Sequence, residues 1–597
     1  MQLSIFANND MVNTIKQTNL QIQSQHTFRY IPLRTLADKS LPAWLFLLCL
    51  LVFARGLMGD FVMDDWPVIK ENSKITETQY IPGYFTSGVW ANTDLSEQTG
   101  AGGHSLYRPL FLLTLNISHH LWGDSAIGYH ALNLVLHSIN PVLVYFLIIG
   151  FWSSASKKTA GMAAAIFAVH PVHVESVAWI AGITDPLVSL FLLGGFLLHR
   201  RSRQRKQQAG LLTIIGAPLC YALALLSKET AILFPLLLLT FDALFHRTSL
   251  KMPDVIFRYA PYAVLLLLYS FLRANALNPD GIAESGLWAH LDFNNWPVLL
   301  EYAAHYVQLL FFPTPLEYYY DSPNIGGLAL TVGGILIFGA LFYIPRALQQ
   351  GQKLFVFALA WAVFFLLPAL PIALFSESVF ATRVLYLPSA GFALFMAWLV
   401  NHAQGLSRPF TMSAKAVVSI MLLWFTIATL TETDDWQNDT VFYTQAMKAS
   451  PDSFKPVAGL AAAKERAEEN DYAIDLYLRA ASMAPQESDQ LDFQESAASL
   501  YGQTGNTQKS EALYKEILQK KPKRSSAWVG LGNNALARGE SQQALSYYQR
   551  AYQADSENFV ASYNLMLIYQ RLGSLQMAAR FRDISRRLQQ KGELKNH

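Results

Sequence analysis

Long apolar runs separated by short polar breaks fill the chain from about residue 43 to residue 431. A membrane-spanning helix needs about 20 mostly apolar residues, because backbone amides in lipid must bond within the helix. Eleven runs meet or approach that length, and we predict that each is a membrane-spanning helix. The runs are 42–57, 128–149, 160–179, 186–199, 210–226, 231–245, 255–272, 328–344, 354–375, 384–400 and 414–430.

Lysine and arginine residues cluster beside alternate breaks, which marks those breaks as cytoplasmic. They are Lys157, Lys158, Arg200, Arg201, Arg203, Arg205, Lys206, Arg247, Lys251, Arg346, Lys353, Arg408 and Lys415. A twelfth apolar run, 297–312, fits this pattern only if it does not cross, so we predict a re-entrant or interfacial helix there. Eleven crossings that start inside then place the C-terminal region outside the cytoplasm, together with a long first loop, 59–127.

From residue 434 onward the chain becomes amphipathic and charged, and its pattern repeats. Small residues recur at spacings of 37, 34 and 34, and glycines recur every 34; they are Ala473, Ser510, Ala544 and Ala578, and Gly505, Gly539 and Gly573. Trp528 and Gly532 form a W-x2-L-G signature, and DTVFYTQAMKASP begins a half-repeat at Asp439. A 34-residue period of this kind predicts tetratricopeptide hairpins. Such hairpins stack into a solenoid whose concave groove suits an extended peptide.

Composition agrees with a membrane protein, since 52% of the residues are hydrophobic and 15% are charged, against about 25% charged in soluble domains. The net charge of +2, with its basic residues in short clusters, gives no reason to expect nucleic acid as a partner. Cys49 and Cys220 lie in apolar runs and offer no disulfide framework. We predict an all-α polytopic bundle over 41–431, preceded by a cytoplasmic tail at 1–40 and followed by a repeat solenoid over 432–597.

Two adjacent carboxylates, Asp64 and Asp65, follow the first predicted span and have apolar residues on both sides. Adjacent acids near a low-dielectric boundary tend to have one raised pKa, which suits a general base or a metal ligand. The alternative is that an aspartate only caps the start of a helix.

A second polar group ends the third predicted span: His170, His173 and Glu175, with Asp185 ten residues further on. Ionisable residues at membrane depth are rare and are candidates for function. Imidazole and carboxylate ligands suit zinc, but Pro171 prevents the two histidines from being regular helical neighbours. We therefore favour a hydrogen-bonded network over a metal site.

Positive charge gathers on the same predicted face, at Arg108, Lys228 and Arg383, with Tyr107 and Glu229 beside the first two. Arginine matches phosphate oxygens with a forked set of donors, and lysine supplies a point charge. Together they suit a polyprenyl phosphate whose tail lies in the bilayer. Each residue alone would more simply be an interfacial anchor or one half of an ion pair.

Seven stretches of the chain resemble the transmembrane and tetratricopeptide-repeat-containing O-mannosyltransferases, which are similar to multi-span glycosyltransferases of the GT-C type. The stretches are MDDWPVIKEN, YRPLFLLTLNISHHLWG, GYHALNLVLH, HPVHVESVAWIAGITDPL, LSKETAILFPLLLL, ATRVLYLPSAGF and TDDWQNDTVFYTQAMKASP. They follow one another in family order, and the likeness runs from Gly59 to the end of the chain. The ordered set is more specific than any single stretch.

The resemblance implies transfer of mannose or a related hexose from a polyprenyl phosphate to Ser or Thr hydroxyls of a protein that the repeats recruit. It implies Asp64 as the catalytic base and Asp65 as its partner. Residues implied to hold the donor phosphate are Lys228, Arg383, Arg108 and Tyr107. Residues implied to orient the substrates are Glu175, Asp185, His170, His173, Glu229 and His130. The resemblance implies no metal ligand, although a divalent metal stays an open alternative.

Two departures from the family pattern bear on the sugar. Family members commonly read Gly-Arg-x-Asp where this chain has Gly182–Ile183–Thr184–Asp185, and many have Glu where this chain has Thr382. The missing arginine is compatible with a changed donor head group.

Two other functions fit the same pattern: a transferase that acts on a lipid or a cell-surface glycan, and a non-catalytic scaffold that anchors repeats for envelope assembly. A transporter fits least, because charges are scarce in the middle of the predicted spans. Compact loops favour a bacterial inner membrane with periplasmic repeats over an endoplasmic-reticulum membrane with lumenal repeats.

Overall fold

The computed structural model describes residues 40–94, 106–151, 157–204, 211–246, 252–277, 296–314, 316, 327–370 and 380–595. These residues form helices joined by turns, which confirms the predicted all-α class. Residues 1–39 of the predicted cytoplasmic tail lie outside the described residues.

A bundle of mostly apolar helices makes up the first part of the structure, and each of the eleven apolar runs overlaps one of its helices. The α-helices are α2 (Ser40–Val52), α3 (Ser73–Thr76), α4 (Ile81–Thr86), α6 (Pro109–Trp122), α7 (Ala126–Ile149), α8 (Lys157–Ala168), α9 (Val174–Ala178), α10 (Thr184–Gln204), α11 (Leu211–Ser227), α12 (Phe234–Phe245), α13 (Met252–Ala276), α15 (Trp296–Phe311), α16 (Gly327–Gln349), α17 (Lys353–Leu366), α18 (Pro388–Leu406) and α19 (Arg408–Asp434). Short helical turns include η2 (Ala54–Met58), η3 (Trp66–Lys70), η4 (Thr78–Tyr80), η5 (Trp90–Asn92), η6 (Pro171–His173), η7 (Ile180–Ile183), η8 (Glu229–Leu233) and η12 (Thr382–Leu385).

Five helices among the described residues are long and apolar enough to cross a membrane, and they lie in α7, α10, α13, α16 and α19. The pair α8 and α9, bent by 49°, makes a sixth if it is one span, and α2, α11 and α17 contribute shorter apolar helices. The chain is therefore a polytopic membrane protein by length and composition, while the number of eleven crossings stays a prediction.

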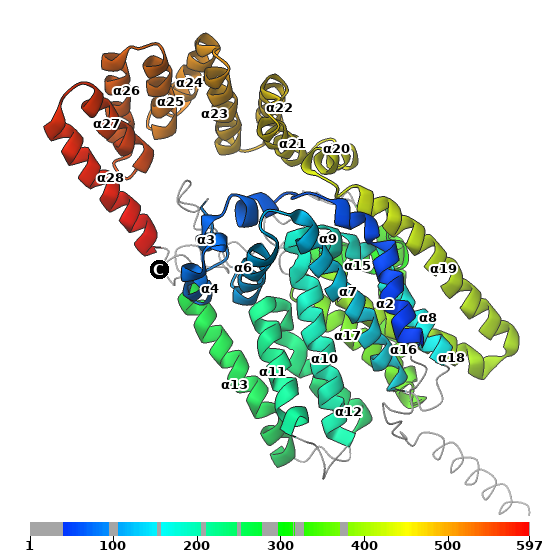
Figure 1. The fold of residues 1–597 in the computed structure, drawn as a ribbon. Helices are drawn as coiled ribbons and strands as arrows, with labels where there is room; N and C mark the ends of the chain where they lie inside the picture. The colour runs from blue at the N-terminus through cyan, green and yellow to red at the C-terminus, as the bar shows by residue number, and fades with distance from the viewer. Residues whose placement is uncertain are drawn as a thin grey trace, which may run out of the picture.

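The bend between α8 and α9 lies at Pro171. His170 before it is extended (φ −70°, ψ 125°), because proline disfavours the helical region for the residue that precedes it. The chain then re-enters helix through η6 and continues into α9, which carries Glu175 and lies at the repeat-facing end of the bundle (Figure 1).

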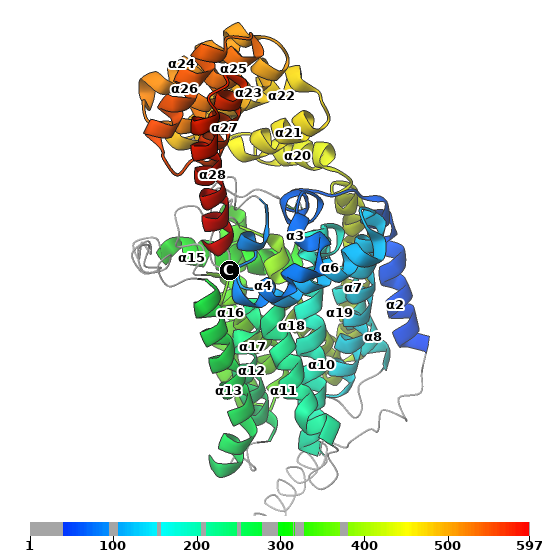
Figure 2. The same ribbon diagram turned by 60° about the vertical axis from the view of Figure 1, so that its left-hand side comes forward.

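The helix α15 covers the twelfth apolar run and has 16 residues. It lies at the repeat-facing end of the bundle (Figure 2), where the Leu310 carbonyl is 3.1 Å from Nε2 of His170. That α15 is re-entrant or interfacial stays a prediction.

Nine further helices form the C-terminal part. They are α20 (Asp439–Ala449), α21 (Phe454–Arg466), α22 (Asn470–Met483), α23 (Glu487–Gln503), α24 (Thr507–Lys520), α25 (Ser525–Ala537), α26 (Ser541–Ala554), α27 (Phe559–Arg571) and α28 (Leu575–Lys595). Gly505, Gly539 and Gly573 have φ of 86°, 80° and 78° in the turns inside three hairpins, a backbone conformation that glycine adopts without strain. The first hairpin has Glu468, with φ of 59°, at the same place.

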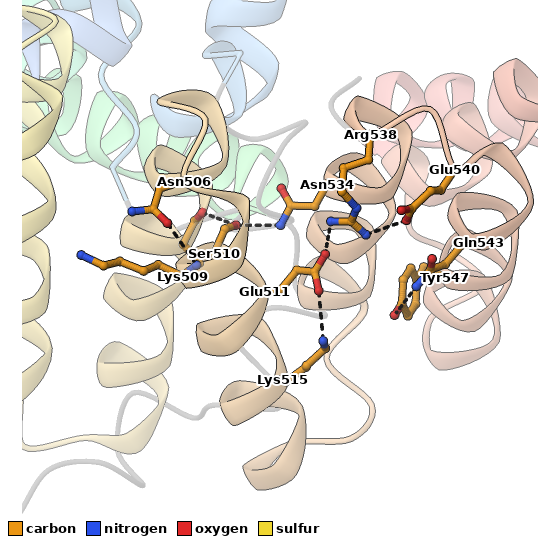
Figure 3. A network of polar contacts seen from close by, with 11 residues as sticks. Asn506, Lys509, Ser510, Glu511, Lys515, Asn534, Arg538, Glu540, Gln543 and Tyr547 are labelled. Atoms are coloured by element: carbon orange, nitrogen blue, oxygen red, sulfur yellow. Dashed lines mark hydrogen bonds and ion pairs between the residues drawn. The ribbon is translucent and has the colours of Figure 1, made fainter.

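Neighbouring repeats are joined by close helix packing and by polar contacts. Between hairpins, a side chain on Gly530 of α25 would clash with the ring of Tyr514 of α24. Within one hairpin, a side chain on Gly532 would clash with the ring of Tyr548 of α26. Small residues are therefore required where these helices cross. Figure 3 shows the polar part of one junction: Asn534 donates to Ser510 over 2.8 Å, and Arg538 forms ion pairs with Glu511 and Glu540. This is the stacked-hairpin arrangement that the 34-residue period predicts.

The repeats lie over one end of the bundle, to which α19 connects them (Figure 1). Three contacts tie the junction to the segment after α2: Arg55 pairs with Asp434 at 2.6 Å, Asp60 N–H donates to the Gln437 carbonyl at 2.8 Å, and Met63 N–H donates to Asp439 at 2.8 Å. The start of the first long loop, 59–66, is therefore packed between the bundle and the first repeat helices.

Candidate active site

The loop that carries the two adjacent aspartates, residues 59–66 (the Asp64 loop), lies on the wall formed by α9 and η7. Asp65 is fully buried and accepts hydrogen bonds from the backbone N–H groups of Val62 (3.0 Å) and Ala181 (2.8 Å). Trp179 Nε1–H donates to the Val62 carbonyl over 3.1 Å. Asp65 therefore holds the loop in place and does not face outward.

The wall itself depends on a glycine. A Cβ on Gly182 would lie 2.7 Å from the Glu175 carbonyl oxygen and 2.9 Å from Cα of Ser176. Since only glycine lets η7 approach α9 so closely, Gly182 sets the position of the Ala181 N–H that holds Asp65.

Asp64 differs from its neighbour. Its side chain is partly exposed, and none of the described residues donates a hydrogen bond to its carboxylate. Burial raises the pKa of Asp64 above its ordinary value, and the positive charge of Arg383 opposes that rise. Burial also raises the pKa of Asp65 well above its ordinary value, although the hydrogen bonds from the Val62 and Ala181 N–H groups oppose that rise. A carboxylate with a raised pKa and oxygens free of hydrogen bonds from the described residues is suited to accept a proton.

Glu175 connects α9 to η12. Its Oε2 accepts from Thr382 Oγ1 and from Arg383 N–H, both at 2.8 Å, and its Oε1 pairs with the Arg383 guanidinium. The guanidinium also lies 5.1 Å from the centre of the Trp179 ring. Thr382, at the position where the family often has Glu, thus helps to hold the carboxylate of Glu175.

Two further ion pairs lie at the same end of the bundle. Lys228 Nζ is 2.6 Å from Oδ1 of Asp185, and both side chains are buried. Arg108 contacts Glu229 through two hydrogen bonds, of 3.0 Å and 2.5 Å. Burial alone would raise the pKa of Glu229, but the charge and hydrogen bonds of Arg108 outweigh it and lower the pKa to about 2.

Electrostatic interactions join these pairs into one group. Arg383 interacts with Asp185 and with Asp64 as well as with Glu175, and Lys228 interacts with Arg108 and Arg383. The structure therefore brings together seven residues from six places in the sequence: Asp64, Arg108, Glu175, Asp185, Lys228, Glu229 and Arg383. We call this group the charged cluster.

The structure places four sequence-predicted residues beside the charged cluster or beneath it. Tyr107 is buried and donates to the Phe85 carbonyl at 3.0 Å, so its hydroxyl is occupied within the first loop. His130 lies beneath the Asp64 loop, where a side chain at Gly59 would be 3.1 Å from its Nε2. His170 and His173 are buried, 3.1 Å from the Leu310 carbonyl and 2.8 Å from Ser389 Oγ.

Several residues of the site were not predicted from the sequence. Thr382 donates to Glu175, and Trp179 contacts both the Arg383 guanidinium and the Val62 carbonyl of the Asp64 loop. Both residues lie inside stretches that carry the family resemblance. Asp439 and Arg466 contact the Asp64 loop from the repeat side, and Asp439 lies in the stretch that bridges α19 and the repeats. Membership of such a stretch was the one available signal for Thr382, Trp179 and Asp439, and Arg466 had none, because these contacts join residues far apart in the sequence.

The part of the chain that the structure describes contains no group of three His, Cys, Asp or Glu side chains arranged to hold a metal ion. What the charged cluster offers is an unpaired carboxylate next to three cations, each of which has an acidic partner. Oδ2 of Asp185 is also buried and has no hydrogen-bond partner among the described residues. The arrangement can accept a proton, bind an anionic group and orient a hydroxyl.

A cavity of about 530 Å³ lies in the repeat domain. Its lining residues come from two neighbouring hairpins and are mostly polar or acidic: Glu468, Asn470, Asp471, Ile474, Asp475, Tyr501, Thr504, Asn506 and Lys509.

Comparisons with known proteins point to one family. A protein O-mannosyl-transferase of Caenorhabditis elegans is 26% identical over 430 residues, which cover 68% of this chain and 57% of the relative. Protein O-mannosyl-transferase TMTC3 of Mus musculus is 24% identical over 502 residues, which cover 77% of this chain and 52% of the relative. Protein O-mannosyl-transferase TMTC4 of Homo sapiens is 25% identical over 451 residues, with 67% and 60% covered.

The chain thus matches between about half and three fifths of the length of these relatives. No family model matches it. The likeness covers most of the chain and agrees with the ordered stretches found in the sequence. The chain is therefore a relative of the transmembrane and tetratricopeptide-repeat-containing protein O-mannosyl-transferases.

Proposed function

We propose that the protein is a membrane glycosyltransferase that moves a sugar from a polyprenyl phosphate to Ser or Thr hydroxyls of protein acceptors. The observation that carries the proposal is the Asp64 carboxylate, which is partly exposed and unpaired among the described residues and lies within the field of Arg383. The relatives are named protein O-mannosyl-transferases, which supports a protein as the acceptor and mannose or a related hexose as the sugar.

The reaction is a single inverting displacement. Asp64 takes the proton of the acceptor hydroxyl, and the oxygen forms a bond to the anomeric carbon. The bond from that carbon to the phosphate oxygen breaks, and the polyprenyl phosphate leaves with the bonding electrons. A carboxylate whose pKa is raised by burial draws the proton more strongly than an ordinary carboxylate does, and the positive charge of Arg383 opposes that rise and so favours the ionised form.

The cations stabilise the negative charge that develops on the leaving phosphate. Arg383 has the most accessible side chain of the three, with 33% exposed against 15% for Arg108 and 7% for Lys228. It therefore makes the direct contact with the phosphate, and Lys228 and Arg108 add positive potential behind it. The free Oδ2 of Asp185 accepts a hydrogen bond from a sugar or acceptor hydroxyl.

The repeats recruit the acceptor. They stand over one end of the bundle (Figure 2). The Asp64 loop is at that end, because Met63 and Trp66 contact Asp439 of α20 and Arg466 of α21. A segment held in the groove of the repeats is therefore close to the reacting hydroxyl position. The reaction takes place outside the cytoplasm, at a bacterial inner membrane with periplasmic repeats or, alternatively, at an endoplasmic-reticulum membrane with lumenal repeats.

The test compares cells that express the wild-type protein, Asp64→Asn, Asp60→Asn or no protein. Asp60 is the matched control, because it is an exposed acid in the same loop and asparagine preserves its acceptor for the Phe61 N–H. Mass spectrometry of extracytoplasmic glycoproteins should show hexose on Ser and Thr with the wild type and Asp60→Asn. With Asp64→Asn these adducts should fall to the level of cells without the protein.

Normal adduct levels with Asp64→Asn, in protein that reaches the membrane in wild-type amount, would refute Asp64 as the base. Adducts that are the same with and without the wild-type protein, or that lie on lipid or glycan, would refute protein glycosylation as the function.

A further inference from the structure

The Asp64 loop is held from the repeat side as well as from the bundle. The Met63 N–H donates to Oδ1 of Asp439 over 2.8 Å, and Asp439 forms an ion pair with Arg466 through its other oxygen. The Arg466 guanidinium lies 4.6 Å from the centre of the Trp66 ring. Asp439 is the first residue of α20, and Arg466 is the last residue of α21. Two helices of the repeat domain thus contact the residues on either side of Asp64 and Asp65.

Met63 has a φ of 57°, which lies in the left-handed region. Outside the repeats it is the one described residue other than glycine with a positive φ. A side chain beyond Cα makes this conformation unfavourable for an L-residue, so it persists only where surrounding contacts hold it. Two hydrogen bonds hold the Met63 backbone: its N–H donates to Asp439 at 2.8 Å, and its carbonyl accepts from the Trp66 N–H at 3.3 Å. The bond to Asp439 is the one that comes from the repeats. If Met63 relaxed to a negative φ, the chain direction into Asp64 would change and the carboxylate would turn.

The residue after Asp64 is fixed independently, because Asp65 accepts hydrogen bonds from Val62 and Ala181. Asp64 is therefore flanked by one residue anchored to the bundle and one anchored to the repeats. Its own carboxylate is left free of hydrogen bonds from the described residues. This is the geometry of a reacting group that is aimed by its neighbours.

We propose that Asp439 is a positioning residue of the transferase: by holding Met63 in the left-handed conformation, the first helices of the repeat domain aim the Asp64 carboxylate at Arg383. The inference rests on the proposed function for its catalytic meaning. The repeats are then part of the active site as well as the place where the acceptor is recruited. Asp439 never touches the substrate, and Arg466 acts by fixing the Asp439 carboxylate.

The first test measures the loop itself and does not depend on activity. Hydrogen–deuterium exchange of the full-length protein in detergent should show faster exchange in the peptide that spans residues 61–66 when Asp439 is replaced by alanine. The matched control is Asp434→Ala, which removes an acid of the same junction that pairs with Arg55 and has no contact with Met63. Asp434→Ala should leave exchange in 61–66 unchanged. Wild-type exchange in this peptide for Asp439→Ala would overturn the proposal.

The second test uses purified protein, a polyprenyl-phosphate mannose and a library of synthetic peptides that contain Ser and Thr. Asp439→Ala should lower kcat about tenfold or more, equivalent to about 1.4 kcal/mol in the barrier, with little change in KM for the peptides. Asp434→Ala should behave as wild type. A raised KM at unchanged kcat would show that Asp439 acts in acceptor binding, which contradicts aiming of the base.

Second-site substitutions in the Asp439→Ala protein distinguish mispositioning of Asp64 from general damage to the fold. Met63→Gly in the Asp439→Ala protein should restore most of the lost kcat, because glycine adopts a positive φ without the side-chain penalty. Met63→Ala in the same background should not restore it. Glu468→Gly relieves the same strain elsewhere, in the turn of the first hairpin, and should stabilise the repeats without rescuing transfer. Equal rescue by all three substitutions, or rescue by none, would overturn the proposal. Absence of transfer by the wild type, with the predicted exchange pattern intact, would refute only the proposed function.

Discussion

The buried ion pair between Lys228 and Asp185 gives the sharpest energetic test of the charged cluster. Its Nζ–Oδ1 distance of 2.6 Å equals the distance between Arg55 and Asp434 at the junction with the repeats. The two pairs differ in burial, since 7% and 6% of the side chains are exposed in the first and 63% and 37% in the second. Any difference in the effect of breaking them therefore reflects the cost of leaving a carboxylate unpaired away from water.

Lys228→Met leaves Asp185 buried without its partner, and its Oδ2 has no hydrogen bond to compensate. Breaking a buried pair in this way costs about 3–5 kcal/mol. Arg55→Met breaks an exposed pair and should cost about 0–1 kcal/mol. Thermal unfolding of the full-length proteins in the same detergent should thus show a clearly lower midpoint for Lys228→Met and a nearly unchanged one for Arg55→Met.

The double variant Lys228→Met with Asp185→Leu completes the cycle. Replacing both charges by apolar side chains removes the unpaired carboxylate, so most of the lost stability should return. Transfer should stay low in the double variant, because the proposed reaction then lacks both the Lys228 ammonium near the donor phosphate and the Asp185 oxygen that accepts from a substrate hydroxyl. Equal midpoints for Lys228→Met and Arg55→Met would refute the electrostatic reasoning, and a double variant with normal transfer would refute the role of Lys228.

Three other outcomes follow from the structure. Because Arg383 opposes the rise in the Asp64 pKa, Arg383→Gln should raise that pKa and move the acidic limb of the kcat/KM profile to higher pH; an unchanged limb would contradict the interaction. Gly391→Ala would place a Cβ 2.7 Å from the Ala358 carbonyl in the contact of α17 with α18, so it should destabilise the protein by about 1–3 kcal/mol. Gly405→Ala, in the same helix with nothing within 4 Å of the new Cβ, should not lower the unfolding midpoint, and a loss equal to that of Gly391→Ala would argue against the packing.

The helices were predictable because their signal is local. Each apolar run overlaps a helix, since the need to bond the backbone internally in lipid leaves little choice of structure. The hairpins were predictable from a repeated period, and the turn glycines lie at positive φ where the spacing put them. The break at Pro171 also follows from local sterics.

The pairing of charges was not predictable in the same way. The partners Lys228 and Asp185 are 43 residues apart, Arg108 and Glu229 are 121 apart, and Arg383 and Glu175 are 208 apart. No period in the sequence connects such positions, because helix packing decides which side chains meet. One-sided placement of the polar residues predicted that they would gather, but it did not predict that each cation would already have an acidic partner.

Asp439 shows the same limit more plainly. In the sequence it is one acid among several at the start of a helix, which is an ordinary place for an aspartate. Its contact with Met63 joins residues 376 apart. The left-handed backbone of Met63 has no signal in the sequence, since methionine rarely adopts it.

The balance of charge in the cluster has a consequence for turnover. Arg108, Lys228 and Arg383 are each matched by a carboxylate before any lipid arrives. In the proposed reaction, the polyprenyl phosphate that leaves therefore meets cations that already share their hydrogen bonds, and it dissociates more readily than it would from three cations without acidic partners. An enzyme built this way should show weak product inhibition by free polyprenyl phosphate and should recycle quickly between donors.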